Sequence, residues 1–303
     1  MAQIYMGEQF WWFYDVVAVA AILVCIFITV KKGLLKAAFS LVGYVLAIAI
    51  AISLSSSIGG SIYEKSVKES NIKKMDQALT EREFNGELAK YLESLGYNIY
   101  VDRDRLETIC EKGEKVDENL YNYVNNINGK KVDEEAIFYN KLHEGYATVM
   151  SGIISRHLSE YSAEYAAVQI EGDPLKFCEF MKLLEDKESM RAPAEFIVEN
   201  YLGKPYRSQV RLITLLALLV IFILITVFIS SSAGRNDNME PGVVSHLLSG
   251  LIGAFKGCVI VFAIAVMVRL YVIFGSNKML FFNHDAIDQT YLFKFVYDLV
   301  KNM

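Results

Sequence analysis

The chain has 303 residues, of which 53% are hydrophobic and 21% charged, and its formal net charge is −5. These averages hide a strong segregation: residues 11–58 carry four charges and residues 212–229 carry none, whereas residues 59–208 carry 20 Lys or Arg and 28 Asp or Glu, a net charge of −8. The acidic balance argues against a nucleic-acid partner, which would need a basic stripe. The segregation predicts a membrane part and a water-soluble part.

The first two apolar runs, residues 11–30 and 37–58, each have the roughly 20 residues that a helix needs to cross a bilayer core. Trp11 to Tyr14 are aromatic, which is typical of a membrane interface. No Lys or Arg precedes the first run and a second run follows at once, so we expect a membrane span rather than a cleaved signal peptide. Between the runs lies KKGLLK, a short cationic loop of the kind that stays in the cytoplasm. The turn residues are Lys31, Lys32, Gly33 and Lys36.

A third span is predicted over residues 212–229 and a fourth over 247–274, where Lys256 and Arg269 interrupt the apolar pattern. An even number of spans places both termini on one side, opposite the cytoplasmic turn. We therefore expect residues 59–208 to lie outside the cytoplasm. The predicted division is a first transmembrane hairpin (1–58), an extracytoplasmic helical domain (59–208), a second transmembrane hairpin (209–275) and a C-terminal amphipathic helix (276–303).

Small residues recur every fourth position in the second and fourth spans, which places each set on one helical face. Because lipid is as apolar as leucine, close backbone approach through such residues is a usual way for membrane helices to associate. We expect spans two and four to pack closely and span three to face lipid. The alternative is that Ala and Gly are simply common in membrane helices. The predicted packing residues are Gly43, Ala47, Ala51, Ser55, Ser245, Ser249, Gly253 and Gly257.

Three charged residues lie within or beside the spans, where polar groups are costly and often functional. Asp15 is near the start of the first span and is expected at the interface. Lys256 and Arg269 can carry their charges to the interface on long side chains. A buried Asp15–Arg269 pair is a further alternative.

Helical periodicity without period-two alternation predicts an all-α domain over residues 59–208. Thr80 with Glu83 reads as a capping box, and Asp102, Asp133 and Asp173 read as N-caps. One broad apolar face follows Asp133. It consists of Ile137, Phe138, Leu142, Val149, Ile153 and Ile154. No nucleotide, hydrolase or metal motif is present, so we expect neither an enzyme nor a cofactor or metal.

The spacing of the four cysteines does not indicate a disulfide framework. Cys25 and Cys258 lie in apolar runs, whereas Cys110 and Cys178 lie in the polar middle and could pair in an oxidising compartment. The last segment, from about residue 283, is a short aromatic amphipathic helix. It would lie on the membrane surface or pack on the middle domain.

The order of a span starting at Asp15, the KKGLLK turn and a small-residue-rich span from Ser40 resembles the CvpA family, the colicin V production proteins. The stretch SHLLSGLIGAFKGCVIVFAI resembles the Leu- and Gly-rich part of that family. The likeness covers about residues 10–60 and 209–300. The long helical insertion departs from the family, whose members usually join spans two and three by a short connection.

The resemblance implies an integral protein of the bacterial inner or cytoplasmic membrane, tied to bacteriocin production or export and to envelope upkeep. It carries over no catalytic residues. We expect an accessory or scaffold protein whose partners are the lipid bilayer and a protein bound through residues 59–208. Whether a second copy of the chain is also a partner is left open. The alternative is a small-molecule or toxin transporter subunit, with Lys256 and Arg269 lining a path.

Overall fold

The computed structural model describes residues 11–81, 84–112, 114–185, 189–232, 242–274 and 284–303. Every regular element in these residues is helical, as the sequence predicted. The chain divides into two compact units. One comprises Met1–Ile62 together with Arg207–Met303, and the other comprises Tyr63–Tyr206. The predicted domain boundaries, at residues 58 and 209, lie a few residues from these limits.

The first unit contains the four helices of the described chain that are long and apolar enough to cross a membrane. Each carries a stretch in which apolar side chains face outward as well as inward, which is the pattern of a helix surrounded by lipid rather than by water. The helices are α1 (Trp12–Lys32), α2 (Leu34–Ile62), α11 (Gly203–Ser232) and α12 (Val243–Phe274). The protein is thus an all-α membrane protein with an inserted helical unit.

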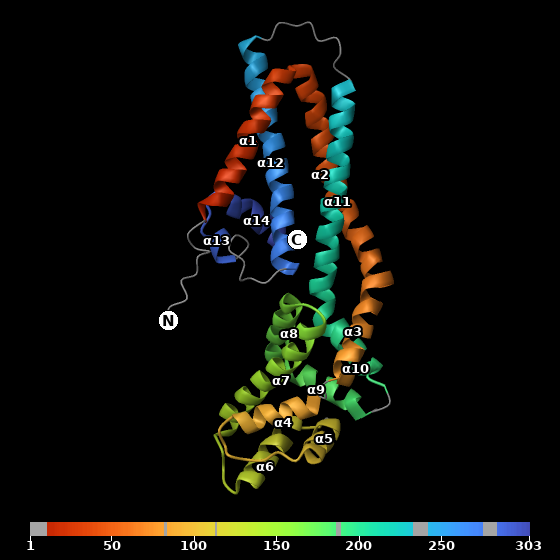
Figure 1. Ribbon diagram of the computed structural model, residues 1–303, viewed down its shortest axis with the longest axis vertical. Helices are drawn as coiled ribbons and strands as arrows, with labels where there is room; N and C mark the ends of the chain where they lie inside the picture. The colour runs from red at the N-terminus through yellow and green to blue at the C-terminus, as the bar shows by residue number, and fades with distance from the viewer. Residues whose placement is uncertain (1–10, 82–83, 113, 186–188, 233–241, 275–283) are drawn as a thin grey trace. The chain divides into compact units, whose positions relative to one another are not determined.

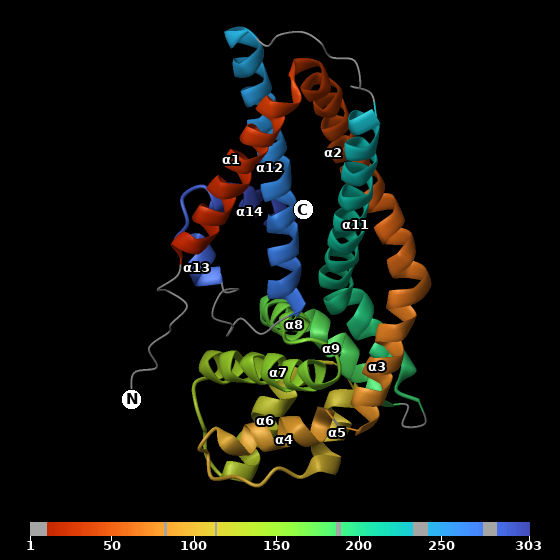
Figure 2. The same cartoon turned by 45° about the horizontal axis from the view of Figure 1, so that its top comes forward.

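Helix α12 is the centre of the membrane unit. It packs along α1 and also contacts α2 and α14 (Phe293–Lys301), as Figures 1 and 2 show. Helices α2 and α11 run side by side in both views. We expected α11 to face lipid; one of its sides is exposed, at Phe228, and the other is buried, at Leu215 and Leu219.

A single residue, Gly33, connects α1 to α2. Its φ of 81° lies in the region that side chains disfavour, so glycine allows the chain to reverse between two long helices. This conformation explains the glycine within the cationic turn.

The C-terminal segment forms two helices, α13 (His284–Asp288) and α14, rather than the single helix that we predicted. Helix α14 packs on α12 and α1 within the membrane unit. It buries Phe293, Tyr297 and Val300, whereas Phe295 and Leu299 are exposed. The outward apolar face has the character of a helix at a membrane surface.

The second unit has its own apolar core. Its centre is α7, which packs against α3, α4, α6, α8 and α9 and fully buries Phe138, Tyr146 and Met150. We predicted that Ile137 belongs to the buried face of α7, and this is wrong, because its side chain is 49% exposed. The helices are α3 (Lys68–Glu81), α4 (Phe84–Ser94), α5 (Arg103–Lys112), α6 (Val116–Asn128), α7 (Glu135–His157), α8 (Glu160–Gly172), α9 (Pro174–Lys182) and α10 (Arg191–Ile197), with π-helical turns at Tyr63–Val67 and Val198–Leu202.

Two of the predicted helix caps are confirmed. The Asp102 carboxylate accepts hydrogen bonds from the backbone N–H groups of Asp104 and Arg105 at the start of α5. The Asp173 side chain accepts from the Lys176 N–H at the start of α9, with Pro174 as the first helical residue.

The predictions of two other helix caps are wrong. Thr80 lies in the last turn of α3, and its hydroxyl donates to the Asp76 carbonyl; its proposed partner Glu83 lies outside the described residues. Asp133 precedes α7 but its carboxylate accepts hydrogen bonds from Lys141 and Tyr97 instead of capping the helix. A charged tertiary partner outweighs a local cap, because hydrogen bonds between ionised groups are the stronger ones.

Candidate functional site

A cavity of about 350 Å³ lies among the four membrane helices. Each helix contributes to its lining. The lining residues are Cys25, Ile28, Thr29 and Lys32 of α1, Lys36, Ser40 and Tyr44 of α2, Val227, Ser230 and Ser231 of α11, and Lys256 and Ile260 of α12.

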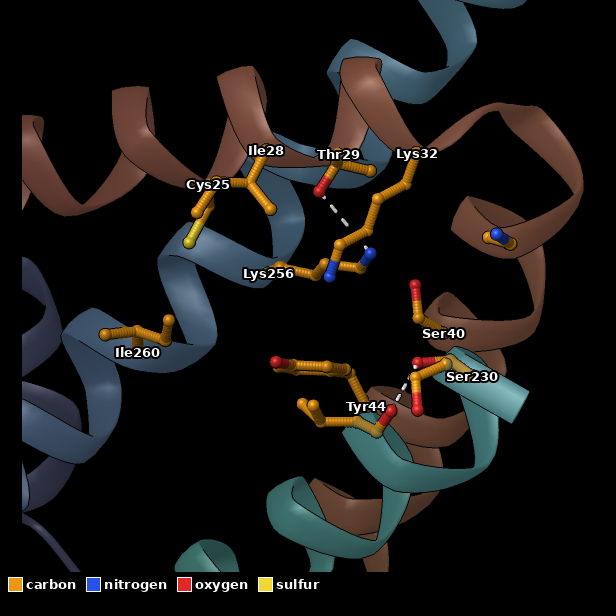
Figure 3. Close-up of a pocket in the computed structure, with 12 residues that line it drawn as sticks. Cys25, Ile28, Thr29, Lys32, Ser40, Tyr44, Ser230, Lys256 and Ile260 are labelled. Atoms are coloured by element: carbon orange, nitrogen blue, oxygen red, sulfur yellow. Dashed lines mark hydrogen bonds between the residues drawn. The ribbon is translucent and has the colours of Figure 1, made fainter. Parts of the chain in front are cut away.

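Three lysines give the cavity its charge. In Figure 3 the side chains of Lys32 and Lys256 converge from different helices on the same space. Lys256 is 8% exposed and donates a long hydrogen bond of 3.4 Å to Thr29 Oγ1. Its ammonium also lies 5.9 Å from the centre of the Tyr44 ring, within the range of a cation–π interaction.

Hydroxyl groups supply the rest of the polar lining. The Ser40 hydroxyl donates to the Ala37 carbonyl of its own helix, and those of Ser230 and Ser231 donate to carbonyls one turn earlier in α11. Each of these oxygens keeps lone pairs, and its proton can turn toward a stronger acceptor. None of the lining residues that the structure describes is acidic. The cavity can therefore hold negative charge.

The two glycines of the predicted α12 row lie against α1, and α12 also contacts α2, as we expected. A Cβ at Gly253 would lie 2.6 Å from the Ile26 Cα, and a Cβ at Gly257 would lie 2.5 Å from the Ile22 Cα. Only glycine permits this approach of two backbones. Ser249 of the same row is buried and Ser245 is half-buried.

The face of α2 that carries the predicted row lies against α11 at Gly43 and again at Gly59. A Cβ at Gly43 would meet the Thr226 side chain, and one at Gly59, four residues beyond the predicted row, would meet the Arg211 backbone. The remaining members, Ala47, Ala51 and Ser55, are buried. Sequence spacing identified the buried faces, but it could not say which helix covers each one.

Asp15 has a role that the sequence did not indicate. Its two carboxylate oxygens accept hydrogen bonds from the backbone N–H groups of Tyr291, Leu292 and Phe293, at distances of 2.8 to 2.9 Å. Asp15 therefore caps α14 from a different helix. This assignment replaces the Asp15–Arg269 pair that we considered.

Lys256 and Arg269 are not brought together. They lie on one straight helix, 13 residues apart, which corresponds to about 20 Å along its axis. Lys256 lines the cavity, and Arg269 is not among its lining residues. Of the turn residues, Lys32 and Lys36 line it, while the ammonium of Lys31 lies over the Phe27 ring, 4.2 Å from its centre. The hydroxyl residues of the cavity come from three helices, and no local motif joins them.

Polar groups inside the second unit hydrogen-bond to one another. His143 Nε2 lies 2.7 Å from the Asp117 carboxylate, which also accepts a hydrogen bond from the buried Tyr146 hydroxyl. Burial raises the pKa of Tyr146 well above its usual value, so this hydroxyl stays protonated. Cys110 and Cys178 are buried free thiols rather than a disulfide. No group of His, Cys, Asp or Glu in the described residues could hold a metal ion.

The class of the protein follows from these observations: a membrane-embedded helical protein with a second, independently cored helical unit between its second and third spans. Comparison of the chain with protein-family models, with curated proteins and with solved structures finds no match.

Proposed function

We propose that this chain is a non-enzymatic accessory protein of a bacterial cell membrane, which recruits a protein partner through the unit Tyr63–Tyr206. One observation carries the proposal: this unit has its own core of buried residues and interrupts a set of membrane helices that contact one another without it. An acidic folded unit of this size is not needed to anchor a helical hairpin. Its surface is therefore the part of the chain suited to a water-soluble partner.

The resemblance to the CvpA family supports a link to bacteriocin production or export and to envelope upkeep. It rests on the span that begins near Asp15, on the turn from Lys31 to Lys36 and on the Gly-rich start of α12. We place the turn in the cytoplasm and the unit Tyr63–Tyr206 outside it, because short basic loops remain on the cytoplasmic side.

Cysteine labelling tests this orientation. The background is Cys25→Ala with Cys258→Ala, since the two remaining thiols are buried. Lys130 and Lys31 are both exposed. A membrane-impermeant maleimide added to spheroplasts should label Lys130→Cys and leave Lys31→Cys unlabelled until the membrane is opened. The reverse pattern would contradict the orientation.

Photocrosslinking in native membranes tests the partner. Val168 on α8 and Leu175 on α9 are large apolar side chains that are 64% and 75% exposed. A photoreactive residue at either position should capture a defined protein, or a second copy of the chain if the partner is itself. The same residue at Leu224, on the outer side of α11, is the control and should capture lipid. Deletion of residues 64–204 should abolish co-purification of the captured protein; unchanged co-purification would exclude recruitment by this unit.

The cavity favours a second candidate, a transporter subunit for a small molecule or toxin. Lys256→Gln separates the two functions. A transporter would lose flux in proteoliposomes while remaining folded, whereas partner capture through Tyr63–Tyr206 would be unchanged.

A further inference from the structure

We infer that the cavity between α1, α2, α11 and α12 binds a phosphate-type anion through Lys32, Lys36 and Lys256. The anion would be either the headgroup of an anionic phospholipid or the phosphate of a small solute. This inference does not depend on partner recruitment by the second unit.

Lys256 carries a charge that is buried between the helices. Its side chain is 8% exposed, and it donates a hydrogen bond of 3.4 Å to the neutral Thr29 hydroxyl. Within the described residues, no carboxylate forms an ion pair with it. An ammonium withdrawn from water without a counter-ion is costly. An anion in the cavity would provide the missing partner.

Lys32 adds a second positive charge to the same space. The ammonium groups of Lys32 and Lys256 approach each other from α1 and α12 (Figure 3), and Lys36 lies on the lining from α2. Two ammonium groups that share one cavity repel each other. A multidentate oxyanion placed between them would convert this repulsion into several charge-assisted hydrogen bonds.

The position and lining of the cavity match a phosphate at the membrane surface. Lys32 ends α1 and Lys36 lies in the first turn of α2, so the cavity is at the depth of the turn. Basic pockets between membrane helices are suited to lipid headgroups. Ile28, Val227 and Ile260 line the same cavity and could contact the apolar part of a lipid. Its volume of about 350 Å³ accommodates a phosphate with attached atoms.

Cys25 provides a local readout, because its thiol lines the cavity. The full-length protein carrying Cys258→Ala would be purified in a neutral detergent and alkylated with N-ethylmaleimide, while Cys110 and Cys178 remain buried. The probes are dioctanoyl phosphatidylglycerol, dioctanoyl phosphatidylcholine and inorganic phosphate. Mass spectrometry of the Cys25 peptide gives the alkylation rate.

We expect phosphatidylglycerol to slow alkylation of Cys25 and phosphatidylcholine, which has no net charge, to have no comparable effect. Protection by inorganic phosphate alone would assign the site to a solute, and protection by both anions would show that the phosphate group suffices. Protection by neither anion, or equal protection by the two lipids, would overturn the inference.

Lys31 and Lys32 form a matched pair for the test. They are adjacent and exposed, but only Lys32 lines the cavity. Lys32→Gln should raise the anion concentration for half-protection at least about tenfold, as expected for loss of a charged hydrogen bond, and Lys31→Gln should leave it unchanged. Equal effects of the two variants would overturn the inference. Lys256→Gln should abolish protection, and the two exposed variants decide the question if Lys256→Gln does not fold.

Discussion

The carboxylate of Asp15 and the backbone N–H of Phe293 lie 278 positions apart in the chain and are joined by a hydrogen bond of 2.9 Å. Two further backbone N–H groups, of Tyr291 and Leu292, donate to the same carboxylate. The Tyr14 and Phe293 rings stack beside this contact, with centres 4.9 Å apart. The first membrane helix thus holds the last helix of the chain by its N-terminus, where a negative charge is also favoured by the helix dipole.

Replacing Asp15 by Ala should release α14. Loss of a capping side chain costs about 1–2 kcal/mol, which corresponds to roughly a 5- to 30-fold change in the population of the undocked helix. The measurement is the maleimide reactivity of Val300→Cys, a buried position of α14, which should rise by that factor.

Asp288→Asn is the control for Asp15→Ala, because Asp288 is exposed in the neighbouring helix α13 and removal of its charge leaves the cap intact. An equal rise in both variants would show that charge, and not capping, holds α14.

Gly257→Ala should weaken the contact between α1 and α12. The new Cβ would lie 2.5 Å from the Ile22 Cα, so the two backbones must separate. Overpacking of this kind costs about 1–3 kcal/mol. Gly250→Ala is the matched control on the same helix, because its nearest neighbour is a Val30 methyl group at 3.9 Å. The thermal unfolding midpoint in detergent should fall for Gly257→Ala and remain near the wild-type value for Gly250→Ala; similar midpoints for both would contradict the close approach.

The thiols of the second unit should be inert while it is folded. Burial raises the pKa of Cys178 to about 12 and also raises that of Cys110, and the reactive form of a cysteine is the thiolate. In the Cys25→Ala, Cys258→Ala background, maleimide should modify neither thiol at neutral pH and both after denaturation. Lys130→Cys, an exposed position, is the positive control. Rapid labelling of Cys110 in the native protein would contradict its burial.

Stability of the second unit should depend on the Asp133 carboxylate. Hydrogen bonds from Lys141 and Tyr97 lower the pKa of Asp133 below its usual value. Its folded pKa is therefore below its unfolded pKa, and the resulting stability is present above the unfolded value and lost as the pH falls toward the folded one. Because both side chains of the Asp133–Lys141 pair are partly exposed, we expect an effect of at most about 1 kcal/mol.

The measurement is the unfolding midpoint of the second unit within the full-length protein between pH 7 and pH 3. Unfolding is monitored by the reaction of Cys110 and Cys178 with 4,4′-dithiodipyridine, which also reacts with thiols in acid. Asp133→Asn should lower the midpoint at pH 7 and show a smaller further loss on acidification than the unsubstituted chain. Parallel pH profiles would rule out the contribution of this carboxylate.

The helical class and the membrane spans could be predicted from the sequence, because each depends on local information. A run of about 20 apolar residues can satisfy its backbone hydrogen bonds in lipid only as a helix or as part of a closed barrel. Asp102 and Asp173 cap the helices that directly follow them. Spacing also identified the buried face of α12 at Gly253 and Gly257, since helical periodicity decides which residues share a side.

Only the tertiary structure decided what those faces contact. Gly253 and Gly257 lie against α1, Asp15 caps a helix from the other end of the chain, and Asp133 pairs with Lys141 instead of capping α7. The cavity likewise gathers Lys32 and Lys256 from positions more than 200 residues apart. Local sequence sets the conformation and the apolar face of each helix, but the partner of each face depends on which distant helices fit against it, and that information is distributed over the whole chain.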